Sequence, residues 1–130
     1  MTGPPTRCGV DLVDVGHFRR GAHASPNVIG KVFTRQELDE CSGQWDRLAA
    51  RFAAKEAAAK ALGTGIRGVS WQEFEIVSLD TGEPLLRLYG NARQQAEALG
   101  LAHWAVSLSH TANLAVAVVV ATASNLTGGA

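Results

Sequence analysis

Asp11 and Glu56 are acidic residues whose surroundings point to chemistry. Asp11 interrupts an apolar run over residues 8–15 that is typical of a β-strand. A carboxylate inside such a strand has to be ion-paired, hydrogen-bonded or metal-bound, because burial without a partner is costly. Glu56 precedes Lys60 by four residues in a helical segment, so the two share one helix face. The spacing alone allows a surface ion pair as well as part of a functional site.

Basic residues gather on the same helical segment. Arg47 and Arg51 lie four residues apart, and Lys55 and Lys60 follow them. Guanidinium and ammonium groups are the usual partners of phosphate in proteins. A solvated helix face and a site for a phosphorylated ligand both explain the pattern, and both interpretations stay open.

His110 stands where an alternating strand pattern meets a turn. It suits a hydrogen-bonded loop residue as well as a functional one. Adjacent side chains of a strand point to opposite faces, so Ser109 and His110 do not form a catalytic pair. The Gly63-Thr64-Gly65 turn follows a helix, whereas phosphate-binding loops precede one, and a helix C-terminal turn explains it better.

The elements that must position these residues can be predicted from periodicity. The longest helical segment covers residues 45–62, is rich in alanine and ends at Gly63. Alanines at four-residue steps form a stripe on it that lets another element approach closely. The members of this stripe are Ala49, Ala53, Ala57 and Ala61.

Shorter elements surround this helix. Thr34 and Glu37 have the spacing of a capping box, which predicts a short helix over residues 34–41, and a further helix is expected over 91–99. Strands are expected at residues 8–15, 74–77, 85–89, 104–110 and 114–120, and a helical pattern without clear bounds follows Gly16. Turn residues between the second and third strands predict a hairpin, and alternation predicts that residues 104, 106, 108 and 110 share one side of the fourth strand. Because strands and helices do not alternate regularly, these elements indicate an α+β fold with a mostly antiparallel sheet packed on the long central helix.

Composition limits the class of protein. The 130 residues, 46% of them hydrophobic, predict a single domain over 1–130 with an ordered core of about 8–122. Twelve basic and twelve acidic residues cancel, which argues against a nucleic-acid partner. Cys8, expected in the core, and Cys41 are too few for a secreted disulfide scaffold, and no apolar run is long enough to span a membrane. We therefore expect a cytoplasmic protein.

Three segments taken together resemble the successive signatures of the phosphopantetheinyl transferases, specifically the short holo-acyl-carrier-protein synthase type. They are residues 9–11 (GVD), 51–66 (RFAAKEAAAKALGTGI) and 106–111 (VSLSHT). Residues 33–38 (FTRQEL) and the turn 82–84 (GEP) also match the family pattern. The resemblance covers residues 8–121 and implies the 4′-phosphopantetheinyl transferase fold.

The resemblance implies a reaction and a set of residues for it. The family moves the 4′-phosphopantetheine arm of coenzyme A to a serine of an apo acyl or peptidyl carrier protein and releases 3′,5′-ADP. Asp11 and Glu56 match the residues that hold Mg²⁺, and Lys60 matches the lysine that contacts the phosphates, which makes these three the candidate catalytic residues. For deprotonation of the serine, Glu56, a metal-bound water and His110 all remain candidates.

The predicted contacts of coenzyme A lie elsewhere in the motifs. Arg51 and His110 match positions associated with its nucleotide, the 3′-phosphate in particular. Arg47, Gly63 and Thr64, together with Lys60, complete the predicted set.

The resemblance also implies partners. Short family members are homotrimers with coenzyme A between neighbouring subunits. Arg19 and Arg20, with His17 nearby, are candidates for docking an acidic carrier protein or carrier domain of fatty acid, polyketide or peptide synthesis. Two other functions would use the same residues: a binding module that has lost turnover, and a Mg²⁺-dependent hydrolase of coenzyme A that would release 3′,5′-ADP without a carrier.

Overall fold

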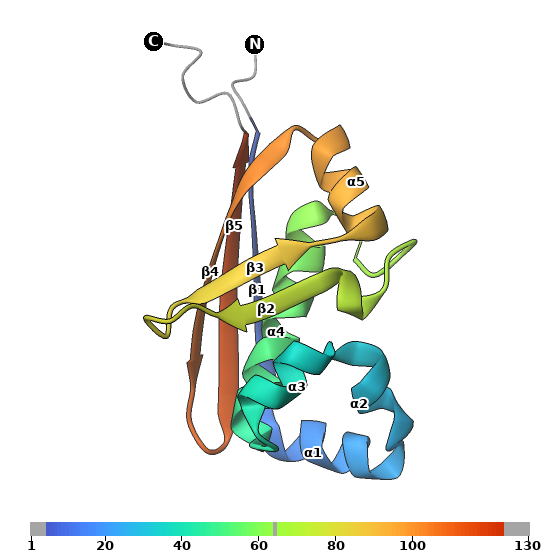
Figure 1. Cartoon of the computed structure of the whole chain (residues 1–130), viewed down its shortest axis with the longest axis vertical. Helices are drawn as coiled ribbons and strands as arrows, with labels where there is room; N and C mark the ends of the chain where they lie inside the picture. Colours follow the sequence, from blue (N-terminus) through green and yellow to red (C-terminus); the bar gives the residue numbers. More distant parts are fainter. Residues whose placement is uncertain (1–4, 64, 124–130) are drawn as a thin grey trace.

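A long helix, α4 (Trp45–Leu62), lies against a three-stranded antiparallel sheet (Figure 1). The structure is a computed structural model that describes residues 5–63 and 65–123. A two-stranded sheet and four shorter α-helices complete the described part of the chain. Their bounds are β1 (Thr6–Asp14), α1 (Val15–Ala24), α2 (Asn27–Val32), α3 (Arg35–Cys41), η1 (Trp71–Glu73, a 3₁₀ turn), β2 (Phe74–Ser78), β3 (Pro84–Leu88), α5 (Gly90–Ala98), β4 (Leu101–His110) and β5 (Leu114–Ala123).

The large sheet has the strand order β1-β5-β4, so β1 and β4 form its opposite edges. Its inner face packs on α4, with Ala117 and Val119 of β5 fully buried. The side chains predicted to share one side of β4 lie on this inner face, where Val106 and Leu108 pack against the main core. The α+β prediction with a central helix is therefore confirmed.

The outer face of the large sheet is apolar and exposed. Alternation along β1 and β5 turns every second hydrophobic side chain away from α4. The exposed members are Val10, Leu12, Leu114, Val118 and Val120. The expectation that Cys8 lies in the core is wrong, since Cys8 is exposed. When only one face of a strand is covered, alternate side chains of an apolar run point to the core and to solvent. Cys8 lies two residues from the exposed Val10 and therefore points to the same, exposed face.

The alanine stripe brings α4 unusually close to β1. Ala57 and Ala61 are buried, and Gly9 of β1 lies directly over them. A Cβ on residue 9 would collide with the carbonyl oxygen of Ala57. The predicted close approach is confirmed, and it requires glycine at this position of the strand.

The hairpin of β2 and β3 and the short helix α3 were also predicted, and both are present. Thr34 and Glu37 form the capping box at the start of α3. The stretch after residue 16, for which the sequence predicted helix without bounds, contains two helices, α1 and α2. Asp14 begins α1 by accepting a hydrogen bond from the backbone N–H of His17. Among the helices described, none combines the length and the apolar character needed to cross a membrane.

A buried ion pair joins α3, α4 and β2. Lys55 and Glu37 are both inaccessible to solvent, and Lys55 Nζ lies 2.8 Å from Glu37 Oε1. Lys55 also donates to the carbonyl oxygens of Trp71 and Phe74, while Glu37 accepts from the backbone N–H of Ile76. Burial lowers the pKa of Lys55, and the charge of Glu37 opposes this change. The pair fixes the small sheet against the central helix.

We expect Gly9→Ala to lower the free energy of unfolding by about 2 kcal/mol, because overpacking a tight backbone contact typically costs about 1–3 kcal/mol. The measurement is urea unfolding followed by circular dichroism. Gly21→Ala is the matched control: Gly21 lies in α1 with open space around it, and alanine should leave stability unchanged or raise it by about 0.5–1 kcal/mol. An unchanged midpoint for Gly9→Ala would show that β1 can move away from α4.

Candidate active site

Asp11, on the inner face of β1, is partnered by a lysine of α4. Lys60 Nζ lies 3.0 Å from Asp11 Oδ1 and donates a hydrogen bond of 3.0 Å to the carbonyl oxygen of Val10. The Asp11 side chain is 15% exposed and that of Lys60 is 55% exposed. The expectation that Asp11 needs a partner is confirmed, and the lysine remains accessible to a ligand.

Glu56 lies one helical turn before Lys60 on α4. Burial raises the pKa of Glu56, the negative charge of Asp11 raises it further, and the positive charge of Lys60 acts in the opposite direction. The two carboxylates are therefore close enough to repel each other. The arrangement is a pair of acidic groups with an ammonium beside them, and we call Asp11, Glu56 and Lys60 the carboxylate cluster.

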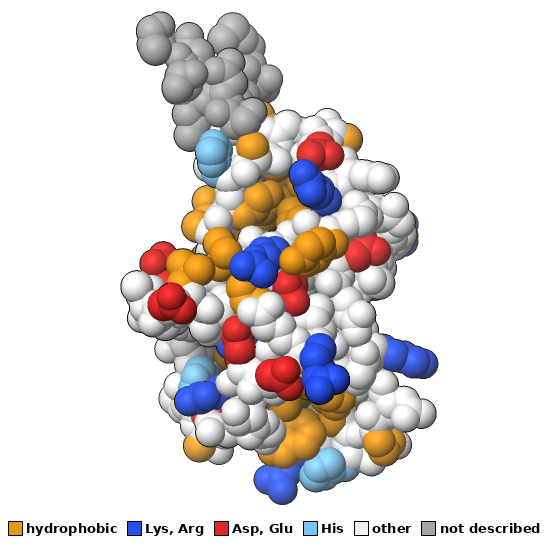
Figure 2. All heavy atoms as spheres, viewed as in Figure 1, with side chains coloured by type: hydrophobic (Ala, Val, Ile, Leu, Met, Phe, Trp, Pro, Cys, Tyr) orange, Lys and Arg blue, Asp and Glu red, His pale blue; other side chains and the backbone are white. Residues whose placement is uncertain are grey.

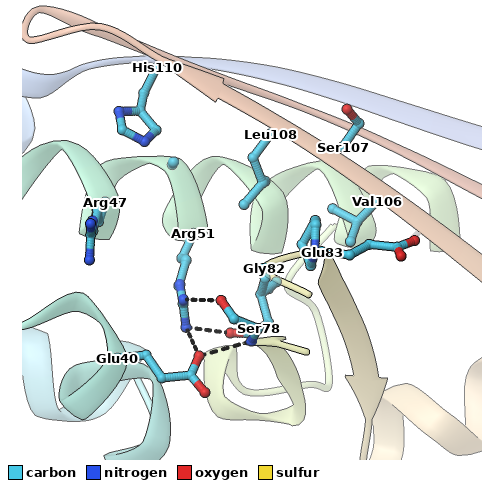
Figure 3. A pocket seen from close by; sticks show the side chains of 13 residues that line it. Glu40, Arg47, Arg51, Ser78, Gly82, Glu83, Val106, Ser107, Leu108 and His110 are labelled. Carbon is cyan, nitrogen blue, oxygen red and sulfur yellow. Dashed lines mark hydrogen bonds and ion pairs between the residues drawn. The ribbon is translucent and has the colours of Figure 1, made fainter. Parts of the chain in front are cut away.

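A cavity of about 600 Å³ opens on another side of α4. It lies between α4, the β2–β3 hairpin and β4 (Figure 3). Its charged and polar lining residues are Glu40, Arg47, Arg51, Ser78, Glu83, Ser107 and His110. The predicted coenzyme A contacts Arg47, Arg51 and His110 thus share one cavity.

Arg51 is largely occupied by internal contacts. Its Nη1 donates to Glu40 Oε1 and to the carbonyl oxygen of Ile76, both at 2.8 Å, and its Nη2 donates to Ser78 Oγ at 3.1 Å (Figure 3). Burial alone would raise the pKa of Glu40, but hydrogen bonds from Arg51 and from the backbone of Ser78 hold it below its ordinary value. These contacts fasten the hairpin wall of the cavity to α3 and α4.

His110, at the end of β4, is paired with the start of α4. Its Nδ1 lies 3.2 Å from Asp46 Oδ2, and both side chains are about one-third exposed. Asp46 Oδ1 accepts the backbone N–H of Arg47 at 3.0 Å. His110 is therefore held at the cavity by a carboxylate from the first turn of the helix.

The predicted glycine turn ends α4 as expected. Gly63 is the C-terminal cap, with φ of 82°, and its backbone N–H donates to the carbonyl oxygen of Lys60. The Arg7 side chain donates to the carbonyl oxygen of Ala61 beside it. Thr64, also predicted to contact coenzyme A, lies outside the described residues.

The structure divides the predicted site residues into two groups. Arg47 and Glu56 are nine residues apart, about two and a half helical turns, so they lie on opposite sides of α4. The carboxylate cluster sits toward β1, whereas His110 belongs to β4, at the other edge of the sheet. The helical spacing of Arg47 and Glu56 is consistent with this separation, but the sequence did not indicate that Asp11 and His110 lie on opposite edge strands of the sheet.

Sequence reasoning missed the residues that hold the cavity in shape. Glu37, Glu40 and Asp46 each pair with a basic residue far from them in the chain or on another element. The capping-box spacing singled out Glu37, but nothing in the sequence indicated that its side chain is buried. The sequence shows that Asp46 is an acidic residue in the first turn of the predicted helix. It does not show that the end of β4, with His110, lies beside it.

Comparison with known proteins identifies the family. The family model of the 4′-phosphopantetheinyl transferase superfamily matches residues 7–119. The chain belongs to the 4′-phosphopantetheinyl transferase superfamily. The prediction of an enzyme of the holo-acyl-carrier-protein synthase type, made from three short motifs, is confirmed.

Individual members of the superfamily are similar over most of the chain. A holo-[acyl-carrier-protein] synthase of Geotalea daltonii is 46% identical, covering 86% of this chain and 94% of its own length. That of Herpetosiphon aurantiacus is 43% identical with the same coverage. The solved structure of a Chronobacterium ammoniagenes ACPS–coenzyme A complex superimposes with a TM-score of 0.81 at 27% identity, over 93% of this chain and 99% of that one.

The raised pKa of Glu56 predicts a pH-dependent stability. Its folded state holds a proton more tightly than its unfolded state, so ionisation opposes folding as pH rises above the ordinary value of 4.5. Without divalent cations, we expect Glu56→Gln to raise the melting temperature more at neutral pH than near pH 4, where the wild-type carboxyl is already protonated.

The control for this melting experiment is Glu97→Gln, which removes an exposed carboxylate on α5. The melting temperature of this variant should not rise above that of the wild type by an amount that increases with pH. Equal gains for Glu56→Gln at both pH values would contradict the raised pKa of Glu56.

Proposed function

We propose that the carboxylate cluster is the catalytic centre for transfer of 4′-phosphopantetheine from coenzyme A to a serine of an apo carrier protein, with Mg²⁺ as cofactor. The observation that carries this proposal is the placement of Asp11, Glu56 and Lys60 around one point. Two carboxylates there repel each other, and an accessible ammonium lies beside them. Such a centre suits a divalent cation and phosphate oxygens together.

The residues present fit Mg²⁺. This ion takes one or two carboxylates and completes its coordination with water and substrate phosphate. Over residues 5–63 and 65–123 there is no cluster of three or more His, Cys, Asp or Glu that could hold a metal. Two carboxylates alone, Asp11 and Glu56, match an ion shared between protein and substrate rather than one enclosed by protein. Val13, two residues after Asp11, supplies no third acidic group.

Mg²⁺, Lys60 and Glu56 would have distinct tasks in the reaction. Bound Mg²⁺ would neutralise charge on the pyrophosphate and stabilise the leaving 3′,5′-ADP. Lys60 places its ammonium against the phosphoryl oxygens, where negative charge develops. Glu56 accepts the serine proton, directly or through a water, as the serine oxygen attacks the phosphorus and the bond to 3′,5′-ADP breaks.

His110 is too far away to serve as this base within one chain. Its partner Asp46 precedes Glu56 by ten residues, about 15 Å along the helix axis. We therefore assign His110 and Arg47 to the nucleotide of coenzyme A in the cavity, with the 3′-phosphate between them. Arg51 contributes from the cavity wall, where it also holds Glu40 and Ser78.

The separation of the two groups supports a coenzyme A site shared between subunits, and the family resemblance implies a homotrimer. Coenzyme A would then contact the cavity of one chain and the carboxylate cluster of the next. The apolar outer face of the sheet, with Val10 56% and Leu12 64% exposed, is the surface for this association. A net charge of zero does not oppose self-association.

The carrier protein is proposed to dock on α1. Arg19 and Arg20 are exposed there and suit an acidic partner. Beside them, His17 and Phe18 line a largely apolar hollow between α1 and α2, over which Figure 2 shows hydrophobic side chains at the surface. Carriers of fatty acid, polyketide and peptide synthesis all remain candidate acceptors. A cytoplasmic location agrees with Cys8 and Cys41 as free thiols.

The reaction can be tested by intact-mass spectrometry of a panel of apo carrier proteins incubated with the enzyme, coenzyme A and Mg²⁺. We expect the phosphopantetheine mass on at least one carrier, and its loss with EDTA. Asp11→Asn and Glu56→Gln should each reduce turnover by at least about 100-fold, because each removes a metal-binding carboxylate. Asp39→Asn, which removes an exposed carboxylate of α3, is the matched control and should retain wild-type turnover.

Other outcomes would redirect the assignment. Turnover at the wild-type rate in Asp11→Asn, or in the presence of EDTA, would show that the reaction does not require Mg²⁺. Release of 3′,5′-ADP without any carrier would indicate a hydrolase, and nucleotide binding without turnover would indicate a binding module.

A shared site also predicts complementation between two chains with different defects, assayed at a coenzyme A concentration low enough that His110→Ala alone shows little turnover. Asp11→Asn keeps its cavity and His110→Ala keeps its carboxylate cluster, so a mixed trimer rebuilds some complete sites. Random mixing in equal amounts should restore about one quarter of the sites of the wild type. The measurement is carrier modification after co-refolding, with each variant alone as control. No gain over the separate variants would place both groups in one chain's site.

A further inference from the structure

Asp46 occupies a place in the cavity that none of the family motifs predicts. One of its oxygens accepts the backbone N–H of Arg47, and the other lies 3.2 Å from Nδ1 of His110. Among the described residues, His110 and Arg47 line the cavity whereas Asp46 is absent from its lining. Asp46 therefore contacts the imidazole without facing the ligand space.

This contact determines how the imidazole can meet a ligand. A carboxylate oxygen 3.2 Å from Nδ1 restrains the ring orientation and favours the proton on that nitrogen. Nε2 is then the nitrogen left for the cavity. A neutral ring has a lone pair at Nε2, which repels a phosphate oxygen, whereas a protonated ring donates a hydrogen bond from it.

We propose that Asp46 is a positioning residue that holds His110 so that Nε2 takes up a proton from solvent when the 3′-phosphate of coenzyme A arrives. This inference rests on the proposed assignment of His110 to that phosphate. Asp46 on one side and the phosphate on the other both stabilise the imidazolium between them. Nucleotide binding is thereby coupled to protonation.

Other charged groups face the same cavity from three elements. Arg47 and Arg51 of α4 oppose a positive charge on His110. Glu40 of α3 and Glu83 of the hairpin favour it. Arg51 and Glu40 neutralise each other at 2.8 Å, which leaves Asp46 as the carboxylate in direct contact with the imidazole among the described residues.

Calorimetry of 3′,5′-ADP binding at about pH 8, in two buffers with different ionisation enthalpies, tests the proposal, because an ordinary histidine is mostly neutral there. The wild type should take up protons on binding 3′,5′-ADP and none on binding 5′-AMP, which lacks the 3′-phosphate. Asp46→Asn should bind 3′,5′-ADP about tenfold more weakly and lose the proton uptake, as expected for loss of a charge-assisted hydrogen bond. His110→Gln should show the same loss.

The sign of the effect separates positioning from simple electrostatics. Removing a negative charge near an anion site should by itself tighten binding of the anion. Equal or tighter binding of 3′,5′-ADP by Asp46→Asn, with proton uptake unchanged, would overturn the proposal. So would a wild type that takes up no protons, or that binds 3′,5′-ADP no better than 5′-AMP.

Binding of 5′-AMP by each variant reports whether the cavity is still folded, and Asp39→Asn controls for loss of a surface carboxylate. In the transfer reaction, Asp46→Asn should raise the KM for coenzyme A more than it lowers kcat. If no carrier is modified while the wild type still takes up protons with 3′,5′-ADP, the proposed transfer fails and the role of Asp46 stands.

Discussion

The buried ion pair of Lys55 and Glu37 is the constraint on which the rest of the structure depends. An ammonium without solvent contact is tolerated only because a carboxylate and the carbonyl oxygens of Trp71 and Phe74 surround it. Since these partners come from α3, η1 and β2, the charge fixes three elements at one point on α4. Removal of either partner would leave the other charged and buried, so the elements cannot separate without a large penalty.

The same junction gives the cavity its wall. Arg51 lies one turn before Lys55, on the same helix, and repeats the arrangement nearer the surface, with Glu40 as the acid and Ser78 as the hairpin partner. On its other side α4 touches β1 through backbone and small side chains, which sets the separation of Asp11 from Lys60. One helix therefore supports two charged sites that have little contact with each other.

Local signals in the sequence were sufficient for most elements and insufficient for the pairing between them. The alanine-rich helix, the capping box at Thr34 and the hairpin turn each carry their own short-range code, and each was predicted correctly. Cys8 was misplaced because an apolar run does not reveal which face of its strand is covered. Asp46 and His110 are 64 positions apart in the chain (110 − 46), so no short-range pattern could predict their contact.

Because of the alanine stripe of α4, this part of the core is more sensitive to substitutions that add volume than to substitutions that remove it. Most cores lose stability when side chains are shortened, because truncation leaves a void. Ala53, Ala57 and Ala61 have almost nothing to truncate, and all three are buried in the main core. Nearly every substitution at these positions adds volume. Evolutionary drift here is thus restricted to small residues, whereas the outer positions of the same helix are free to vary in size.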